Sequence, residues 1–188
     1  MIIDINQAKI AVADKYKIYV GEQEAYRAAR KLLRLFAEVN LFRMDDPEPR
    51  LTIKKKFSFL KAAYAIRRGG TSYDFTTQSI LRDHYQCSLD RDLYDLYGHR
   101  GRKFSIYRND TQVAWWDKEA VSWFAGDNYR IVADDDADAE ILIAFCLIID
   151  NYRSDDHDND VVHVDIGKIG PQAKKFDPDW KPRTVKSH

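Results

Sequence analysis

A run of nine consecutive apolar residues, Ile141 to Ile149, constrains the fold of this chain more than any other feature. At 100° per residue the run covers every face of a helix, and a helix that is apolar all round must be enclosed on all sides. As a helix it is about 14 Å long, far short of the roughly 20 residues that cross a bilayer. A fully buried strand is the alternative, because four of the nine residues are isoleucine. Acidic residues crowd one end only, as at a helix N-terminus, so we predict a helix over Ala137–Tyr152.

The length and composition indicate one folded domain with a tail. A chain of 188 residues is long enough for a sizeable core, and 45% apolar with 13% aromatic residues excludes a disordered class. The chain starts without a basic segment followed by an apolar one, and no window holds 18 apolar residues. We therefore expect neither a signal peptide nor a transmembrane segment.

The two cysteines, Cys87 and Cys146, cannot form a disulfide framework, and Cys146 lies inside the apolar run. We expect both to be free thiols, Cys146 buried, as is usual in a reducing cytoplasm. The net charge is zero, but residues 1–110 carry +7 and residues 111–188 carry −7. The two parts either meet inside the fold or turn one charged face toward an anionic partner.

Short alternating segments separated by turn residues fill much of the chain. Gly21, Gly69-Gly70, Gly126-Asp127 and the Asn109-Asp110 hairpin turn interrupt them. This spacing predicts a mainly β protein, a meandering barrel or a sandwich. The expected strands are Lys15–Val20, Arg50–Phe59, Ala62–Arg67, Lys103–Arg108, Thr111–Trp116, Glu119–Phe124 and Asn128–Ala133.

Two stretches have no clear assignment from their own residues. Residues 1–14 form a mixed lead-in without a clear period. Glu22–Met44 fits an amphipathic helix by propensity, yet its second half alternates like strands.

The segments KKKFSFLKAAYAI and KFSIYRNDTQVAWWDKEAVSWFAGDNYRIVADDDADAEILIAFCLIIDN together resemble the LURP-one-related proteins. That family belongs with the Tubby C-terminal domain and the phospholipid scramblases. The resemblance implies a Tubby-like closed antiparallel β-barrel of about twelve strands around one central hydrophobic helix. It also favours strands for Glu22–Met44.

The resemblance implies a barrel over residues 15–152 with the central helix at 137–152. The helix usually ends such proteins, whereas residues 153–188 follow it here. This extension either adds a strand over Val161–Ile169, packs on a neighbour or stays loose. We expect partial order, because apolar residues alternate in Val161–Ile169. The acidic run Asp134, Asp135, Asp136 and Asp138 is also denser than the family pattern requires.

No motif of an enzyme is present. The sequence lacks GxSxG, HExxH, GxxxxGK[ST] and GxGxxG, and its histidines lack the spacing of metal ligands. His84 and Cys87 would act as a base and a nucleophile only if the fold brought them together. We therefore expect a protein without catalytic activity, metal or cofactor.

The acidic run over residues 155–160 partly resembles a calcium-binding loop, with Asp156, Asp158 and Asp160 at its first, third and fifth positions. Val161 and Gly167 stand where such a loop needs glycine and glutamate. A solvated acidic linker is the preferred interpretation, and calcium binding stays open.

Basic residues form the leading candidate for a binding site. In the Tubby domain, basic side chains on neighbouring strands hold a phosphoinositide headgroup. The resemblance implies the same role toward phosphate or an anionic membrane for Lys54, Lys56, Lys61, Arg67 and Arg68. A plain solvated face explains the same charges, because lysines also protect strand edges. A second basic group surrounds Tyr26 and consists of Arg27, Arg30, Lys31 and Arg34.

The sequence thus predicts a non-catalytic binding or scaffold protein, cytoplasmic and peripheral at the membrane, that recognises anionic lipid headgroups or phosphate. The alternatives are an interaction module that uses residues 153–188 to form homo-oligomers or hold a protein partner, and a scramblase-like lipid-handling protein. A helix that plugs a barrel is not free to enter a bilayer, which disfavours the scramblase-like role. Nucleic-acid binding is disfavoured by the zero net charge.

Overall fold

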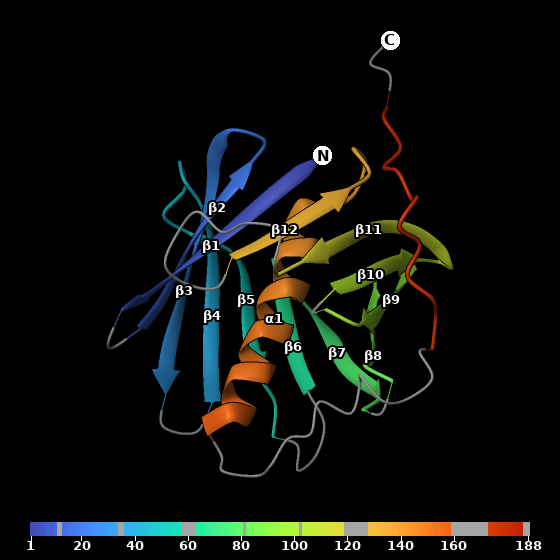
Figure 1. The fold of residues 1–188 in the computed structure, drawn as a ribbon. Coiled ribbons are helices and arrows are strands. Elements are labelled where there is room, and N and C mark those ends of the chain that lie inside the picture. Colours follow the sequence, from blue (N-terminus) through green and yellow to red (C-terminus); the bar gives the residue numbers. More distant parts are fainter. Residues whose placement is uncertain are drawn as a thin grey trace.

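The computed structural model describes residues 1–10, 13–33, 36–57, 63–80, 82–101, 103–118, 128–158 and 173–185. Within them, twelve antiparallel strands form one closed barrel in which each strand pairs with the next along the chain, and β1 pairs with β12 (Figure 1). The strands are β1 (Ile2–Ile10), β2 (Ala13–Val20), β3 (Gln23–Leu33), β4 (Phe36–Arg43), β5 (Pro49–Lys55), β6 (Ala63–Arg68), β7 (Thr71–Ser79), β8 (His84–Leu89), β9 (Asp92–His99), β10 (Lys103–Arg108), β11 (Thr111–Asp117) and β12 (Asn128–Ala133). The predicted mainly β barrel is confirmed.

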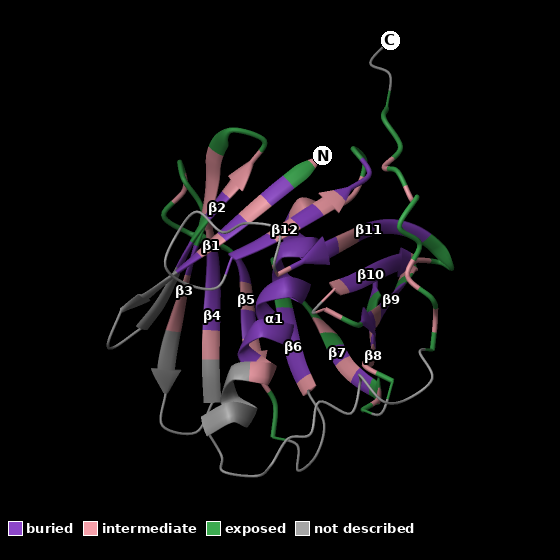
Figure 2. Cartoon of the chain, in the orientation of Figure 1, coloured by how far each residue is buried: buried purple, intermediate pink, exposed green. Residues whose placement is uncertain are grey.

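Alternation along the strands separates the inner face of the barrel from its outer face. Leu51 and Ile53 of β5 are buried, whereas Thr52 and Lys54 between them are partly exposed. Successive side chains of a strand point to opposite faces, so one apolar set lines the inside. Figure 2 shows the resulting buried layer on the strands around the helix.

The helix α1 (Ala139–Asp158) fills the barrel (Figure 1). None of the nine side chains from Ile141 to Ile149 is more than 3% exposed, so the helix is enclosed on every face. The ring of Phe145 lies 5.6 Å from that of Phe75 and 5.5 Å from that of Tyr94. Each large apolar side chain buried in this way contributes about 1.5–3 kcal/mol. The predicted central hydrophobic helix is confirmed.

Asp138 caps the start of α1. Its Oδ1 accepts a hydrogen bond of 3.3 Å from the N–H of Ile141, three positions on, and its carbonyl accepts 3.0 Å from the N–H of Leu142. These are the bonds that an N-cap aspartate makes. Glu140 in the first turn adds a negative charge where the helix dipole is positive.

The helix continues past Tyr152, where the sequence predicted its end. Asp150 and Asn151, the polar residues that follow the apolar run, are both buried in the structure. Tyr16 and Tyr129 donate hydrogen bonds to the carboxylate of Asp150. Because these partners satisfy it inside the barrel, the polar pair does not terminate the helix.

The first strand, β1, lies within residues 1–14, which the sequence predicted to be a lead-in. β1 pairs with β2 on one side and with β12 on the other, and so closes the barrel. Ile3 and Ile5 are fully buried, but the next inward residue is Gln7, which breaks the apolar alternation. The strands predicted for Glu22–Met44 by family resemblance are β3 and β4.

Two predicted strands, Glu119–Phe124 and Val161–Ile169, lie outside the described residues. Of the extension 153–188, residues up to 158 continue α1 and residues 173–185 form an extended segment beside β9, β10 and β11 (Figure 1).

Candidate functional site

The outer face of β2 to β6 carries a group of cationic side chains on neighbouring strands. Lys17 of β2 pairs in register with Arg27 of β3, and Thr52 of β5 with Arg67 of β6. Lys54 is two residues along from Thr52 and therefore lies on the same face. We call Lys17, Arg27, Lys54 and Arg67 the basic face.

Most members of the basic face keep their charge near solvent. Arg27 and Arg67 are exposed. The guanidinium of Arg27 lies 5.4 Å from the ring centre of Phe42, within the range of a cation–π contact. Lys54 Nζ lies 2.9 Å from Glu38, and Lys17 Nζ lies 3.9 Å from Glu24. Ion pairs near the surface contribute only about 0–1 kcal/mol, so both lysines stay close to solvent.

The structure brings together only part of the predicted lysine and arginine site. Lys54 and Arg67 share the outer face of adjacent strands. Lys56 follows the end of β5 and is paired with Asp74 of β7. Arg68 points away from that face, toward the start of α1. Lys61 lies outside the described residues.

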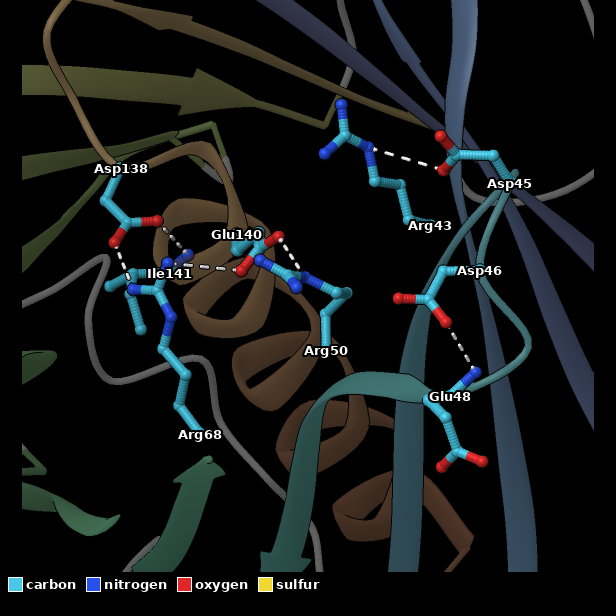
Figure 3. A network of polar contacts seen from close by, with 9 residues as sticks. All are labelled: Arg43, Asp45, Asp46, Glu48, Arg50, Arg68, Asp138, Glu140 and Ile141. Atoms are coloured by element: carbon cyan, nitrogen blue, oxygen red, sulfur yellow. Dashed lines mark hydrogen bonds and ion pairs between the residues drawn. The ribbon is translucent and has the colours of Figure 1, made fainter. Parts of the chain in front are cut away.

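Arg68 takes part in a network of ion pairs around Glu140 at the start of α1 (Figure 3). Arg50 Nε lies 3.1 Å from one oxygen of Glu140, and Arg68 Nη2 lies 3.2 Å from the other. Arg68 also pairs with Asp138, the cap residue. The hydrogen bond to Glu140 is the main cause of the raised pKa of Arg50. Since the side chain of Glu140 is only 7% exposed, this network holds the helix in the barrel rather than offering a free cation.

The acidic residues before α1 each pair with a cation from a different part of the chain, a feature that sequence spacing did not reveal. Asp138 pairs with Arg68 of β6, and Asp136 with Arg108 of β10 at 3.1 Å. The amino group of Met1 lies 2.7 Å from Asp135, and Arg183 of the extension pairs with Asp134. These four ion pairs therefore connect Met1, Arg183, β6 and β10 to the turn that precedes α1.

The residues that raised a catalytic question do not act together. His84 Nε2 lies 2.7 Å from Asp95, and its ring stacks on Tyr97 at 4.6 Å. Cys87 faces the core, where burial raises its pKa to about 12. The thiol is thus protonated, and no described residue acts on it as a base, unlike the nucleophile of a cysteine enzyme.

Among the residues described, no three side chains of His, Cys, Asp or Glu gather in a way that would hold a metal ion. Residues 155–158 of the acidic run 155–160 belong to α1. The calcium-binding interpretation of this run rests on side chains that the structure does not describe. The helix of the described chain is not long and apolar enough to cross a membrane.

Comparison with known proteins gives one result. The family model described as LURP-one-related matches residues 1–150. No curated protein and no solved structure gives a significant match. The matched part contains every strand of the barrel and most of the buried part of α1, and it ends before the segment 173–185.

Proposed function

The chain belongs to the LURP-one-related family, and from that premise we propose that it is a non-catalytic binding protein whose basic face holds anionic lipid headgroups at a membrane surface. Membership suggests a Tubby-like role in binding lipids or proteins. In this proposal the protein is cytoplasmic and peripheral, and it works without a cofactor.

The basic face is the observation that carries the proposal. Its four cations come from β2, β3, β5 and β6 and point outward from a rigid barrel wall. Each lysine or arginine near an anionic bilayer contributes about 1 kcal/mol. The two exposed arginines, Arg27 and Arg67, thus give about 2 kcal/mol, which corresponds to roughly a thirtyfold preference for an anionic surface.

Flotation with liposomes tests the proposal. Neutral phosphatidylcholine vesicles are compared with vesicles that also contain phosphatidylserine or a phosphoinositide, at low and at high salt. We expect the chain to float only with the anionic vesicles and only at low salt, because salt screens exposed charges. Free inositol phosphate that competes as well as vesicles would show that the headgroup alone is recognised.

A matched pair of variants makes the test specific. The double variant R27E/R67E reverses two exposed charges of the basic face and should abolish flotation. The control R91E/R100E reverses two exposed arginines in the turns at either end of β9, across the barrel, and should float like the native chain. Equal loss in both variants, or flotation that survives R27E/R67E, would refute the basic face as the binding surface.

A second candidate function is a protein-interaction module. It is favoured by the segment 173–185, which contacts the barrel in two places. Phe176 packs beside His99, and Arg183 pairs with Asp134. If the extension joined copies of the chain, light scattering would give a mass above 22.0 kDa that falls when Arg183 is replaced. The scramblase-like role is not favoured, because α1 is enclosed by the strands.

A further inference from the structure

The segment 173–185 rests on a surface of aromatic rings on the outside of the barrel. The ring of Phe176 lies 5.2 Å from His99 and 5.8 Å from Trp115. Lys103 Nζ lies 5.6 Å from the centre of the same ring. Phe176 is therefore surrounded by side chains from β9, β10 and β11, well away from the basic face.

A lysine of the segment uses two further rings of the same surface. Lys174 Nζ lies 3.6 Å from the ring centre of Tyr107 and 5.5 Å from that of Tyr97. A cation this close to an aromatic face is attracted by about 0.5–2 kcal/mol. Along residues 173–177 exposed and partly buried positions alternate, so an extended segment presents Lys174 and Phe176 on one side.

Arg183 anchors the other end of the segment on a buried acid. Its backbone N–H donates to Asp134 Oδ1 at 2.6 Å, and its guanidinium Nε donates to Oδ2 at 2.8 Å. Its carbonyl accepts a bond of 3.1 Å from the N–H of Asp135. The side chain of Asp134 is 0% exposed while that of Arg183 is 57% exposed. Among the described residues, the hydrogen bonds to this carboxylate all come from the segment.

The receiving surface and the segment belong to different parts of the chain. The surface residues from Tyr97 to Asp134 lie within residues 1–150, which match the family, whereas the segment lies beyond them. The barrel thus provides aromatic rings and a carboxylate whose hydrogen bonds, among the described residues, come from the segment. A buried carboxylate is costly without a partner, so this surface is suited to a positively charged chain.

We infer that this surface is a binding site for an extended protein segment that carries lysine, phenylalanine two residues later and arginine seven residues after that. Residues 173–185 occupy it in cis as an internal substitute for the partner. The covalent link to the barrel keeps the local concentration of the segment high. A partner segment with the same anchors and further contacts displaces it. This role is independent of the basic face.

A labelled peptide with the sequence of residues 173–185 tests the inference on the full chain. We expect no binding to the native chain, whose site is occupied, and saturable binding to the full-length variant F176S/R183E, whose own segment is released. The difference should be at least tenfold in Kd. The same peptide with the changes F176S and R183E is the control and should bind neither chain.

One further variant distinguishes a site from non-specific attraction. Adding D134N to F176S/R183E removes the acid that receives arginine and should weaken peptide binding at least tenfold. Equal binding to the native and released chains, or no binding to a released chain that melts cooperatively, would overturn the inference.

Trypsin gives an independent measure that does not depend on the double variant. Cleavage after Lys175 should be several-fold faster in R183E than in the native chain, because the docked segment is protected. Equal cleavage rates would show that the segment is not held by Asp134. A doubled mass that depends on Arg183 would show that a second copy, rather than the same chain, supplies the segment.

Discussion

The N–H of Gly98 donates a hydrogen bond of 2.8 Å to the carbonyl of Asp83, and the two backbones are so close that a side chain at Gly98 has no room. A Cβ atom at this position would lie 2.4 Å from the Cβ of Asp83. Asp83 in turn accepts a hydrogen bond of 2.9 Å from Arg153 of α1. Because Gly98 has no side chain, β9 can pack directly against Asp83, the residue that binds Arg153 of α1.

The variant G98A should lower the free energy of unfolding by about 1–3 kcal/mol, the usual cost of overpacking. G70A is the matched control, because a Cβ there meets nothing within 4 Å. Urea denaturation of both variants checks the difference. If G98A unfolded at the same urea concentration as G70A, the close approach would not exist in solution.

A charge in the middle of α1 should prevent folding. Ala144 and Leu147 are both 0% exposed, and an unpaired charge buried there costs about 3–5 kcal/mol or more, a large share of a typical domain's stability. Neither A144D nor L147D should melt cooperatively in circular dichroism. The control L93D changes a residue that is 37% exposed on β9 and should fold. Cooperative melting of A144D would contradict the enclosed helix.

Neighbouring arginines should differ sharply in their effect on stability. Arg68 binds Asp138 and Glu140, so R68A leaves two carboxylates with weaker pairing and should cost about 1–3 kcal/mol. Arg67 is exposed on the opposite face, and R67A should stay within about 0.5 kcal/mol of the native chain. Thermal melts at equal pH compare the two. Similar losses for both would argue against the network at the helix start.

Neither thiol should react with an alkylating reagent while the protein is folded. Burial raises the pKa of Cys87 to about 12 and that of Cys146 well above its ordinary value, so the reactive thiolate is scarce near pH 8. Mass spectrometry should find no label on the native chain and two labels after denaturation. Rapid labelling of Cys87 in the native chain would mean that β8 opens readily.

The pair between Met1 and Asp135 should make stability depend on pH in the acid range. The hydrogen bond and the charge of the terminal amine lower the pKa of Asp135 below its usual 3.8. A lowered folded pKa stabilises the fold above the unfolded value, and the stabilisation is lost as pH falls through the folded value. D135N should therefore melt below the native chain near neutral pH, and the difference should shrink below about pH 3.8. A constant difference would exclude this linkage.

The helix and most strands are predictable because their apolar patterns are local. Ile141–Ile149 indicates a helix enclosed on all faces, and the Asn109-Asp110 turn between β10 and β11 has the positive φ angles that its residues favour. The missed strand β1 and the underestimated length of α1 share one cause. Gln7 contacts Tyr16, which also bonds Asp150, so polar groups line part of the barrel interior and hide the apolar period.

The candidate sites were less predictable because they depend on distant partners. The charges at Lys54 and Arg67 can be read from the sequence, but their shared face follows from strand register. The acids before α1 are denser than the family pattern requires, yet each pairs with a cation in the structure. Asp135 and the amine of Met1 are 134 residues apart. No spacing rule joins positions so far apart.

The pairing of β1 with β12 has a consequence for biosynthesis. Asp4 and Arg130, which pair across these strands, are separated by 126 residues. At about 5–20 residues per second, a ribosome needs on the order of ten seconds to make the residues between them. During that time the first strand has an open edge that other chains can pair with. The newborn chain is thus most prone to aggregation before its last strand emerges, and a chaperone that covers the first residues would act in that interval.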